Sequence, residues 1–117
     1  MIDLNLVLLI LLGHFVADFI CQSDYHAINK SKSNLVLGQH VLVYMSVMSI
    51  IVGILFPINL VWCIINLIGH FVTDFCTSRL TGKLWVANQR HWFFVAIGFD
   101  QLIHYITLLT TYNIFVS

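Results

Sequence analysis

The sequence predicts an all-α protein, a bundle of four transmembrane helices that uses the whole chain as one membrane domain. Of its 117 residues, 60% are hydrophobic and only 9% are charged, whereas a soluble domain is usually about a quarter charged. A membrane-crossing helix needs about 20 mostly apolar residues, and four such stretches occur at 4–22, 35–56, 58–79 and 92–115. The short connections predict antiparallel neighbours, so we expect residues 1–117 to form a single integral membrane domain.

The cations predict the orientation of the helices. All five lie in or beside the connections that follow the first and third spans. Short cytoplasmic loops carry an excess of Lys and Arg, so both of these connections should be cytoplasmic, and both termini and the turn at Pro57 should lie outside. We therefore expect a multi-pass protein of the bacterial inner membrane. The five cations, which are candidates for headgroup or phosphate contact, are Lys30, Lys32, Arg79, Lys83 and Arg90.

A duplicated motif predicts an internal repeat. Residues 13–19 read Gly-His-Phe-Val-Ala-Asp-Phe, and residues 69–75 repeat six of these seven letters. Each half of the chain contains two spans, so the halves at about 4–56 and 58–115 should have the same orientation. The fold class is therefore two tandem parallel two-helix repeats, N-out and C-out, related by an axis along the membrane normal.

Each half of the duplication opens with a polar stripe. In the span 4–22, His14, Asp18 and Gln22 follow one another at intervals of four, which places them on one helix face. No Lys or Arg precedes this span, so we interpret it as a retained helix and not as a cleaved signal peptide. The span 35–56 adds His40 and Tyr44.

The second half repeats this arrangement. The span 58–79 carries His70, Asp74 and Ser78 on one stripe, with Trp62 expected near the outer interface. The connection 80–91 contains Trp85 and is expected to form an interfacial turn. The span 92–115 carries another acid and imidazole four residues apart, with a glutamine beside the acid: Asp100, Gln101 and His104.

Seven of these polar residues should share one layer in the cytoplasmic half of the membrane. An aspartate at a helix centre costs about 2.5–3.5 kcal/mol on the insertion scale, so three unpaired carboxylates would be expensive. No Lys or Arg lies within the spans at that depth, which leaves protons, protonated histidines or metal ions as counter-charges. The seven candidate metal ligands are His14, Asp18, His40, His70, Asp74, Asp100 and His104.

Imidazole together with carboxylate is a usual ligand set for zinc, manganese or iron. We therefore expect one or two divalent transition-metal ions, with the catalytic residues left open. A metal would activate water, which favours a metal-dependent hydrolase at the membrane surface, although nothing in the sequence identifies the bond that is cut. Hydrogen bonds that orient the ligands are expected from Gln22, Tyr44, Ser78 and Gln101.

Three other interpretations remain open. A proton- or ion-coupled carrier could use the same residues as a relay, a haem could take two histidines as axial ligands, and the chain could be a structural subunit of a membrane complex. Membrane lipid is the expected partner, and a homo-oligomer could cover the polar layer. The net charge of zero argues against nucleic acid.

The motifs resemble a known family. Four features are similar to small bacterial membrane proteins catalogued as domain of unknown function 3307. They are the Gly-His-Phe-Val-Ala-Asp-Phe stretch with Gln22 after it, His40, the second motif copy with Arg79 after it, and the Asp100-Gln101-x-x-His104 ending. The likeness covers almost the whole chain. It implies a four-helix inner-membrane protein without an established activity. Ser78 departs from the Lys-like or polar residue expected there, and the His/Asp pattern is also faintly similar to membrane-bound metal-dependent hydrolases.

Overall fold

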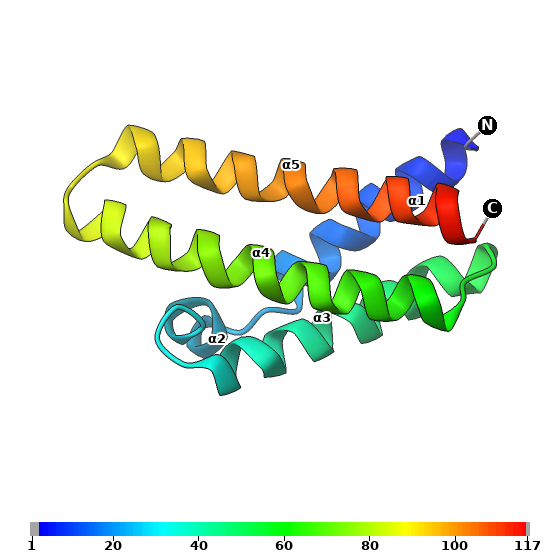
Figure 1. The fold of residues 1–117 in the computed structure, drawn as a ribbon, viewed down its shortest axis with the longest axis horizontal. Helices are drawn as coiled ribbons and strands as arrows, with labels where there is room; N and C mark the ends of the chain where they lie inside the picture. Colours follow the sequence, from blue (N-terminus) through cyan, green and yellow to red (C-terminus); the bar gives the residue numbers. More distant parts are fainter. Residues whose placement is uncertain (1–2, 117) are drawn as a thin grey trace.

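The computed structural model describes residues 3–116 as an all-α bundle, which confirms the all-α prediction. Figure 1 shows α4 and α5 as a long antiparallel pair, with α3 beside α4 and α1 crossing obliquely behind. Both termini lie at the end of the bundle where α3 turns into α4. The elements in order are α1 (Leu4–Phe15), the π-helix η1 (Val16–Ile20), α2 (Asp24–Asn29), α3 (Asn34–Leu55), α4 (Leu60–Val86) and α5 (Arg90–Phe115).

Among the described residues, three helices are long and apolar enough to cross a membrane: α3, α4 and α5. The fourth apolar segment, Leu4–Ile20, is shorter. The 12 residues of α1 and 5 of η1 span roughly 25 Å, against a hydrocarbon core of about 30 Å. The outer surface suits lipid, since large apolar side chains such as Ile54 and Leu60 are 73% and 72% exposed.

The predicted end of the third span was wrong. α4 continues past residue 79 to Val86, so most of the expected loop 80–91, including Trp85, is helical. Residues 87–89 make the turn into α5, and Asn88 has φ 59°, a left-handed conformation that asparagine tolerates better than most residues. The polar and charged residues at 79–83 lie within the helix, because helix formation does not stop where hydrophobicity does.

The first connection is also more structured than expected. Residues 24–29 form the short helix α2, and the Ser23 hydroxyl accepts a hydrogen bond from the His26 backbone N–H at its start. A serine at this position satisfies one of the unpaired N–H groups of a helix start. α2 packs against α3, so Lys30, the residue that ends α2, is held close to the bundle.

The bundle is divided into an apolar and a polar half. Trp62 lies in the apolar half: it is 0% exposed, and its Nε1–H donates to the Leu108 carbonyl at 3.2 Å. We expected Trp62 at the outer interface, but α5 covers it, and the Tyr112 ring packs edge-on against it at 5.6 Å. The buried apolar cluster on this side includes Leu6, Ile10, Tyr44, Met45, Met48, Val52, Trp62, Leu108 and Tyr112.

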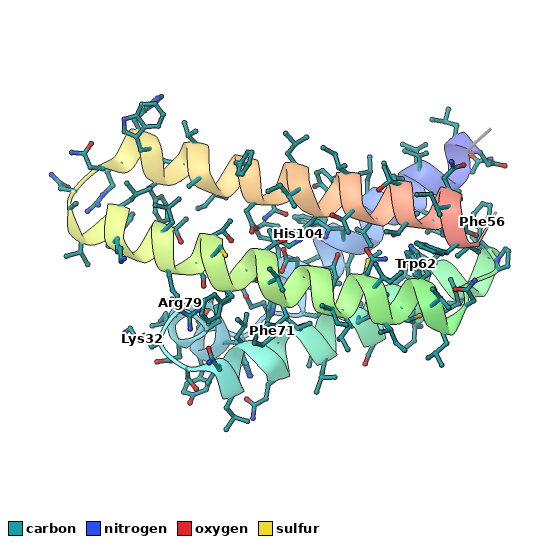
Figure 2. All side chains as sticks on the ribbon, in the orientation of Figure 1. Lys32, Phe56, Trp62, Phe71, Arg79 and His104 are labelled. Carbon is teal, nitrogen blue, oxygen red and sulfur yellow. The ribbon has the colours of Figure 1, made fainter. Side chains whose placement is uncertain are left out.

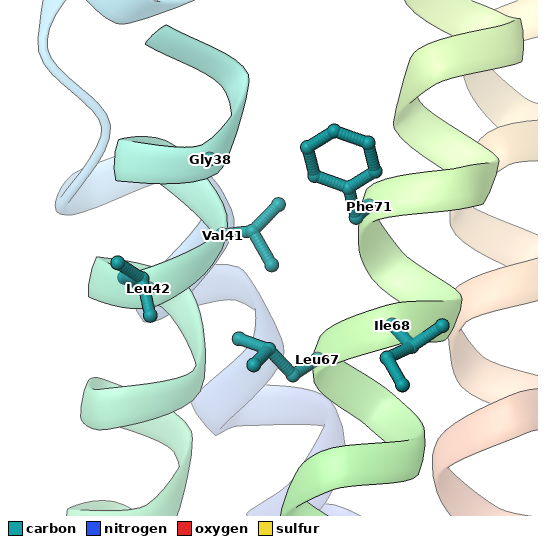
Figure 3. A pocket seen from close by; sticks show the side chains of 6 residues that line it. All are labelled: Gly38, Val41, Leu42, Leu67, Ile68 and Phe71. Carbon is teal, nitrogen blue, oxygen red and sulfur yellow. The ribbon is translucent and has the colours of Figure 1, made fainter. Parts of the chain in front are cut away.

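An apolar crevice of about 310 Å³ separates parts of α3 and α4. Figure 3 shows the side chains that line it, which come from one turn of each helix. Its lining contains no polar side chain and none of the histidines and aspartates, so it is separate from them. Its lining residues are Gly38, Val41, Leu42, Leu67, Ile68 and Phe71.

The glycines of the two motif copies meet different surroundings. A Cβ atom on Gly13 would lie 3.1 Å from Ile51 Cγ2 and 3.3 Å from Met48 Sδ, both on α3. A Cβ atom on Gly69 would lie 3.5 Å from Thr107 Cγ2, an ordinary contact. Gly13 therefore permits close approach of α1 to α3, whereas Gly69 is not needed for packing.

We predict that Gly13→Ala is less stable than Gly69→Ala by about 1 kcal/mol. Alanine gains up to about 1 kcal/mol over glycine in a helix, and this gain should appear at position 69. At position 13 the added methyl displaces Ile51 and Met48, and overpacking offsets the gain. Thermal unfolding of both variants in the same detergent measures the difference, and equal melting temperatures would contradict the assigned packing.

Candidate metal centre

The π-helix η1 positions the first carboxylate. At Val16 the α-helix changes to i→i+5 bonding, and the Cys21 N–H donates to the Val16 carbonyl at 2.9 Å. Such π turns often occur at functional sites. Asp18 lies inside this turn, is 4% exposed, and has Oδ2 at 3.5 Å from the Nε2 of His14. The first motif copy therefore turns its carboxylate into the centre of the bundle.

Four donor atoms from three helical segments converge at one point, and one of them belongs to Asp18. His40 Nε2 on α3 and His70 Nε2 on α4 are 3.2 Å apart. His40 Nε2 lies 3.0 Å from Asp18 Oδ1 and 3.3 Å from Asp74 Oδ2. His70 Nε2 lies 3.5 Å and 3.3 Å from the same two oxygens. All four side chains are buried, and none of them is more than 4% exposed.

These distances match the edges of a metal coordination tetrahedron. Zinc–nitrogen and zinc–oxygen bonds of about 2.0–2.1 Å require donor atoms about 3.3–3.4 Å apart. Five of the six donor pairs lie 3.0–3.5 Å apart, and the sixth pair, Asp18 with Asp74, falls within the 4.8 Å that encloses the group. Together, His40, His70, Asp18 and Asp74 could therefore hold one ion.

A second donor group adjoins the first and shares its carboxylates. Asp74 turns Oδ2 toward the first group and Oδ1 toward His104, whose Nε2 is 3.0 Å away. His104 Nε2 is also 3.2 Å from Asp100 Oδ2, and Asp18, Asp100 and His104 present donor atoms within 4.8 Å of one another. Asp74 thus has the geometry of a bridging carboxylate. Figure 2 shows His104 on α5 directed into the space between the helices.

His14 is adjacent to these groups, but both of its ring nitrogens have other partners. Its Nε2 is 2.5 Å from the Gln101 Oε1, which can only accept, so Nε2 carries the proton. Its Nδ1 is 2.7 Å from the Tyr44 hydroxyl. The structure therefore brings six of the seven expected ligands into the two donor groups, and places His14 beside them as a hydrogen-bonding residue.

The residues expected to orient the ligands fall into two pairs. Tyr44 stacks on His70 with ring centroids 3.9 Å apart, and Gln101 Nε2 donates to Asp100 Oδ2 at 3.0 Å. Ser78 Oγ and Gln22 Oε1 are buried without a hydrogen-bond partner among the described residues. The first pair supports the ligands, whereas the second pair is available to a bound molecule.

Comparison with known proteins identifies the family of the chain. The family model described as "Protein of unknown function (DUF3307)" matches residues 6–117. The chain belongs to the DUF3307 family. Comparisons with curated proteins and with solved structures found no significant match. The likeness identified from the two motif copies is thus confirmed over nearly the full chain, and the chemistry of this DUF3307 protein rests on its own geometry.

A lysine reaches the donor groups from outside the spans, which the sequence did not suggest. Lys30 Nζ lies 3.0 Å from Asp74 Oδ2, and the lysine side chain is only 18% exposed. Burial alone would lower the pKa of Lys30, but the carboxylates of Asp74 and Asp18 outweigh it and raise that pKa above its ordinary value. The prediction considered only Lys and Arg within the spans, whereas Lys30 reaches the layer from the connection because α2 folds back against α3.

The other cations lie farther out in this DUF3307 protein. Arg79 stacks on Phe75 at 3.7 Å and donates to the Asn34 side chain at 2.8 Å. Arg90 stacks on Trp85 at 3.6 Å. A surface groove of about 520 Å³ is lined by three cations, Lys32, Arg79 and Lys83, and Figure 2 shows Lys32 and Arg79 at the same end of the bundle.

A cavity of about 580 Å³ leads from this end of the bundle to the donor groups. Asp18, Asp74 and Asp100 form part of its lining, together with residues of α2, α4 and α5. Sequence periodicity could not reveal this cavity, because it forms where the α4–α5 pair extends past the end of η1. The carboxylates are therefore accessible from one side although each is buried.

We predict that Lys30→Met destabilises the metal-free protein. The change leaves the Asp74 carboxylate, which is 1% exposed, without its cationic partner, and losing a hydrogen bond to a charged group costs about 1.5–3 kcal/mol. Lys32→Met, at an exposed neighbour, is the matched control and should unfold like the parent. Thermal unfolding in detergent with a chelator present measures both. Identical stability of the two variants would contradict the ion pair.

Proposed function

We propose that this protein is a metal-dependent hydrolase of the membrane, with a carboxylate-bridged His/Asp centre that holds one or two divalent ions. The observation that supports it is the set of five donor–donor distances of 3.0–3.5 Å among His40, His70, Asp18 and Asp74. Ordinary packing does not require four buried metal-binding side chains to point their donor atoms at one another. A shared cation explains why they do.

The donor set favours zinc, manganese or iron. Imidazole nitrogen and carboxylate oxygen suit all three, whereas calcium and magnesium prefer oxygen donors alone. Three carboxylates with four neutral imidazoles leave a negative centre that Lys30 only partly neutralises. Divalent ions supply the remaining positive charge, and this is the main physical reason to place a metal here.

Hydrolysis follows from the difference between the two donor groups. The first group has four protein ligands, which is the count of a closed site. The second group has three donors, Asp18, Asp100 and His104, and its Asp100 lines the 580 Å³ cavity, so one coordination position is left for water or substrate. Asp18, Asp100 and His104 would hold a divalent ion there, and such an ion would supply a water of lowered pKa as the nucleophile.

The apolar half of the bundle argues against the carrier alternative. Transport would need a polar path from the donor groups to the end of the bundle that holds the termini. In the part of the chain that the structure describes, that region contains the apolar cluster around Ile10, Met48, Trp62 and Leu108. A centre that opens on one side fits an enzyme better than a relay across the membrane.

The orientation of the chain remains part of the proposal. We infer that α1 with η1 forms a fourth, short membrane-inserted segment, and that the two halves are parallel repeats with both termini outside the bacterial inner membrane. The support is the distribution of cations, which gather at the end opposite the termini. In this orientation the cavity opens toward the cytoplasmic headgroup layer.

We predict one or two equivalents of zinc, manganese or iron in the protein purified in detergent without chelator. His70→Ala removes a donor of the first group and should reduce the metal content by at least half. His91→Ala, at an exposed histidine, is the matched control and should leave the content unchanged. Elemental analysis normalised to protein concentration measures all three samples. The absence of stoichiometric metal in the parent protein would refute the proposal.

The second donor group generates a separate prediction. Asp100→Asn weakens a ligand of the open group only, so a two-ion protein should lose about one equivalent and retain the other. Gln101 Nε2 can still donate to the amide oxygen of asparagine, which limits structural damage. Titration with cobalt(II), followed by its absorption spectrum, distinguishes the four-ligand environment from the open one. Loss of both ions together would show that the two groups are not separate sites.

A further inference from the structure

We propose that the 580 Å³ cavity binds an amphipathic phosphate monoester, with its phosphate at the donor groups and its apolar tail along a wall of α4 and α5. This inference rests on the proposed metal-dependent hydrolase and names the substrate class of its site. The cavity is large enough for a headgroup and the start of a chain, because ligand sites typically enclose about 300–1,000 Å³.

An unsatisfied hydroxyl marks the inner part of the cavity. Ser78 is 8% exposed, lines the cavity, and its Oγ has no hydrogen-bond partner among the described residues. Gln22 lines the same cavity, and its Oε1 is also buried without a partner. Buried polar groups are normally hydrogen-bonded, so these two side chains indicate a polar ligand. A phosphate oxygen would accept the hydrogen bond that the Ser78 hydroxyl has available.

The charges of the lining make anion binding depend on the metal. Asp18, Asp74 and Asp100 outnumber the two lysines of the lining, Lys30 and Lys32. The metal-free cavity is therefore net negative and repels a phosphate. A single divalent ion would make the net charge of the lining positive, and a second ion would increase that positive charge. A phosphate with two negative charges is then the complementary ligand.

One wall of the cavity is apolar and leads away from the charges. Trp85 on α4 and Phe93 on α5 pack edge to face at 5.0 Å and both line the cavity, together with Ile97. Trp85 remains 49% exposed. A sugar phosphate would leave this wall in contact with water, whereas the chain of an amphiphile would cover it at about 0.8 kcal/mol per buried methylene.

The closed end of the cavity favours a monoester over a diester. The lining of the cavity includes Asp18, Asp74 and Asp100 but neither His70 nor Tyr44, whose stacked rings fill the space beside these carboxylates. A terminal phosphate reaches this end with a single substituent leading back along the wall of Trp85 and Phe93. A diester would need space for a second substituent at the same point.

The proposed reaction consumes one water. The water oxygen forms a bond to phosphorus, the bond between phosphorus and the substrate oxygen breaks, and a proton from water passes to that oxygen. The products are an alcohol that keeps the tail and inorganic phosphate. No oxidant, reductant or further reactant is needed.

The test uses the full chain in nanodiscs of zwitterionic lipid, loaded with zinc or manganese, with metal content measured first. One arm places phosphatidic acid in the disc, and the other adds glycerol 3-phosphate, which has a phosphate monoester but no apolar tail. We expect release of inorganic phosphate with a kcat/KM at least about tenfold higher for the lipid phosphate, and none after chelation. Ser78→Ala should raise KM for both substrates.

A pair of neighbouring phenylalanines tests the apolar wall. Phe93→Ala should lose most of the preference for the lipid phosphate, whereas Phe94→Ala, at a side chain that is 64% exposed and outside the cavity, should retain it. Phe93→Leu should keep most of the preference for the lipid phosphate. This result would show that the loss in Phe93→Ala comes from the missing apolar side chain and not from a disturbed fold. Metal content and melting temperature are measured for each variant.

The outcomes separate this inference from the proposed function. A protein that binds metal but hydrolyses neither monoester, or hydrolyses both equally well, overturns the substrate class and leaves the metal centre standing. Equal effects of the two alanine variants would also overturn the assigned wall. A protein without metal refutes both proposals together.

Discussion

The buried carboxylate of Asp74 constrains this bundle more than any other group. It is 1% exposed, and an uncompensated charge in such a place is expensive. Both of its oxygens are in use: Oδ2 faces Lys30, His40 and His70, and Oδ1 faces His104. These partners come from four parts of the chain, so satisfying one carboxylate requires α3, α4, α5 and the end of α2 to meet at one level.

The division of the bundle into two halves follows from this requirement. Polar partners gather around the aspartates, and the remaining length of the helices is filled by apolar side chains such as Ile10, Met48 and Trp62. The apolar half closes the centre on the side of the termini. The cavity opens it on the other side, where α4 and α5 extend beyond η1. A reactive centre with one entrance limits both the solvent and the substrates that reach it.

Much of this arrangement could be predicted from the residues alone. Spacing of four residues placed His70 with Asp74 and Asp100 with His104 on single helix faces, and these pairs approach to 3.3 Å and 3.2 Å. Hydropathy located the long helices. The ends of the helices were predicted less well, because α4 carries its charged residues on a helix that continues to Val86, and neither charge nor Gly82 stops a helix by itself.

The sequence by itself determined that His and Asp side chains would share a helix face, because helical geometry relates residues that are close in the chain. Only the tertiary structure decided which of their atoms lie within about 3 Å of one another. It turned both nitrogens of His14 to Gln101 and Tyr44, and it brought Lys30 to Asp74 across 44 residues. It also packed Gly13 closely while leaving space at Gly69, although both glycines stand in nearly identical motifs. Such contacts depend on how separate helices pack and on where a short connection folds back, and neither is encoded in local spacing.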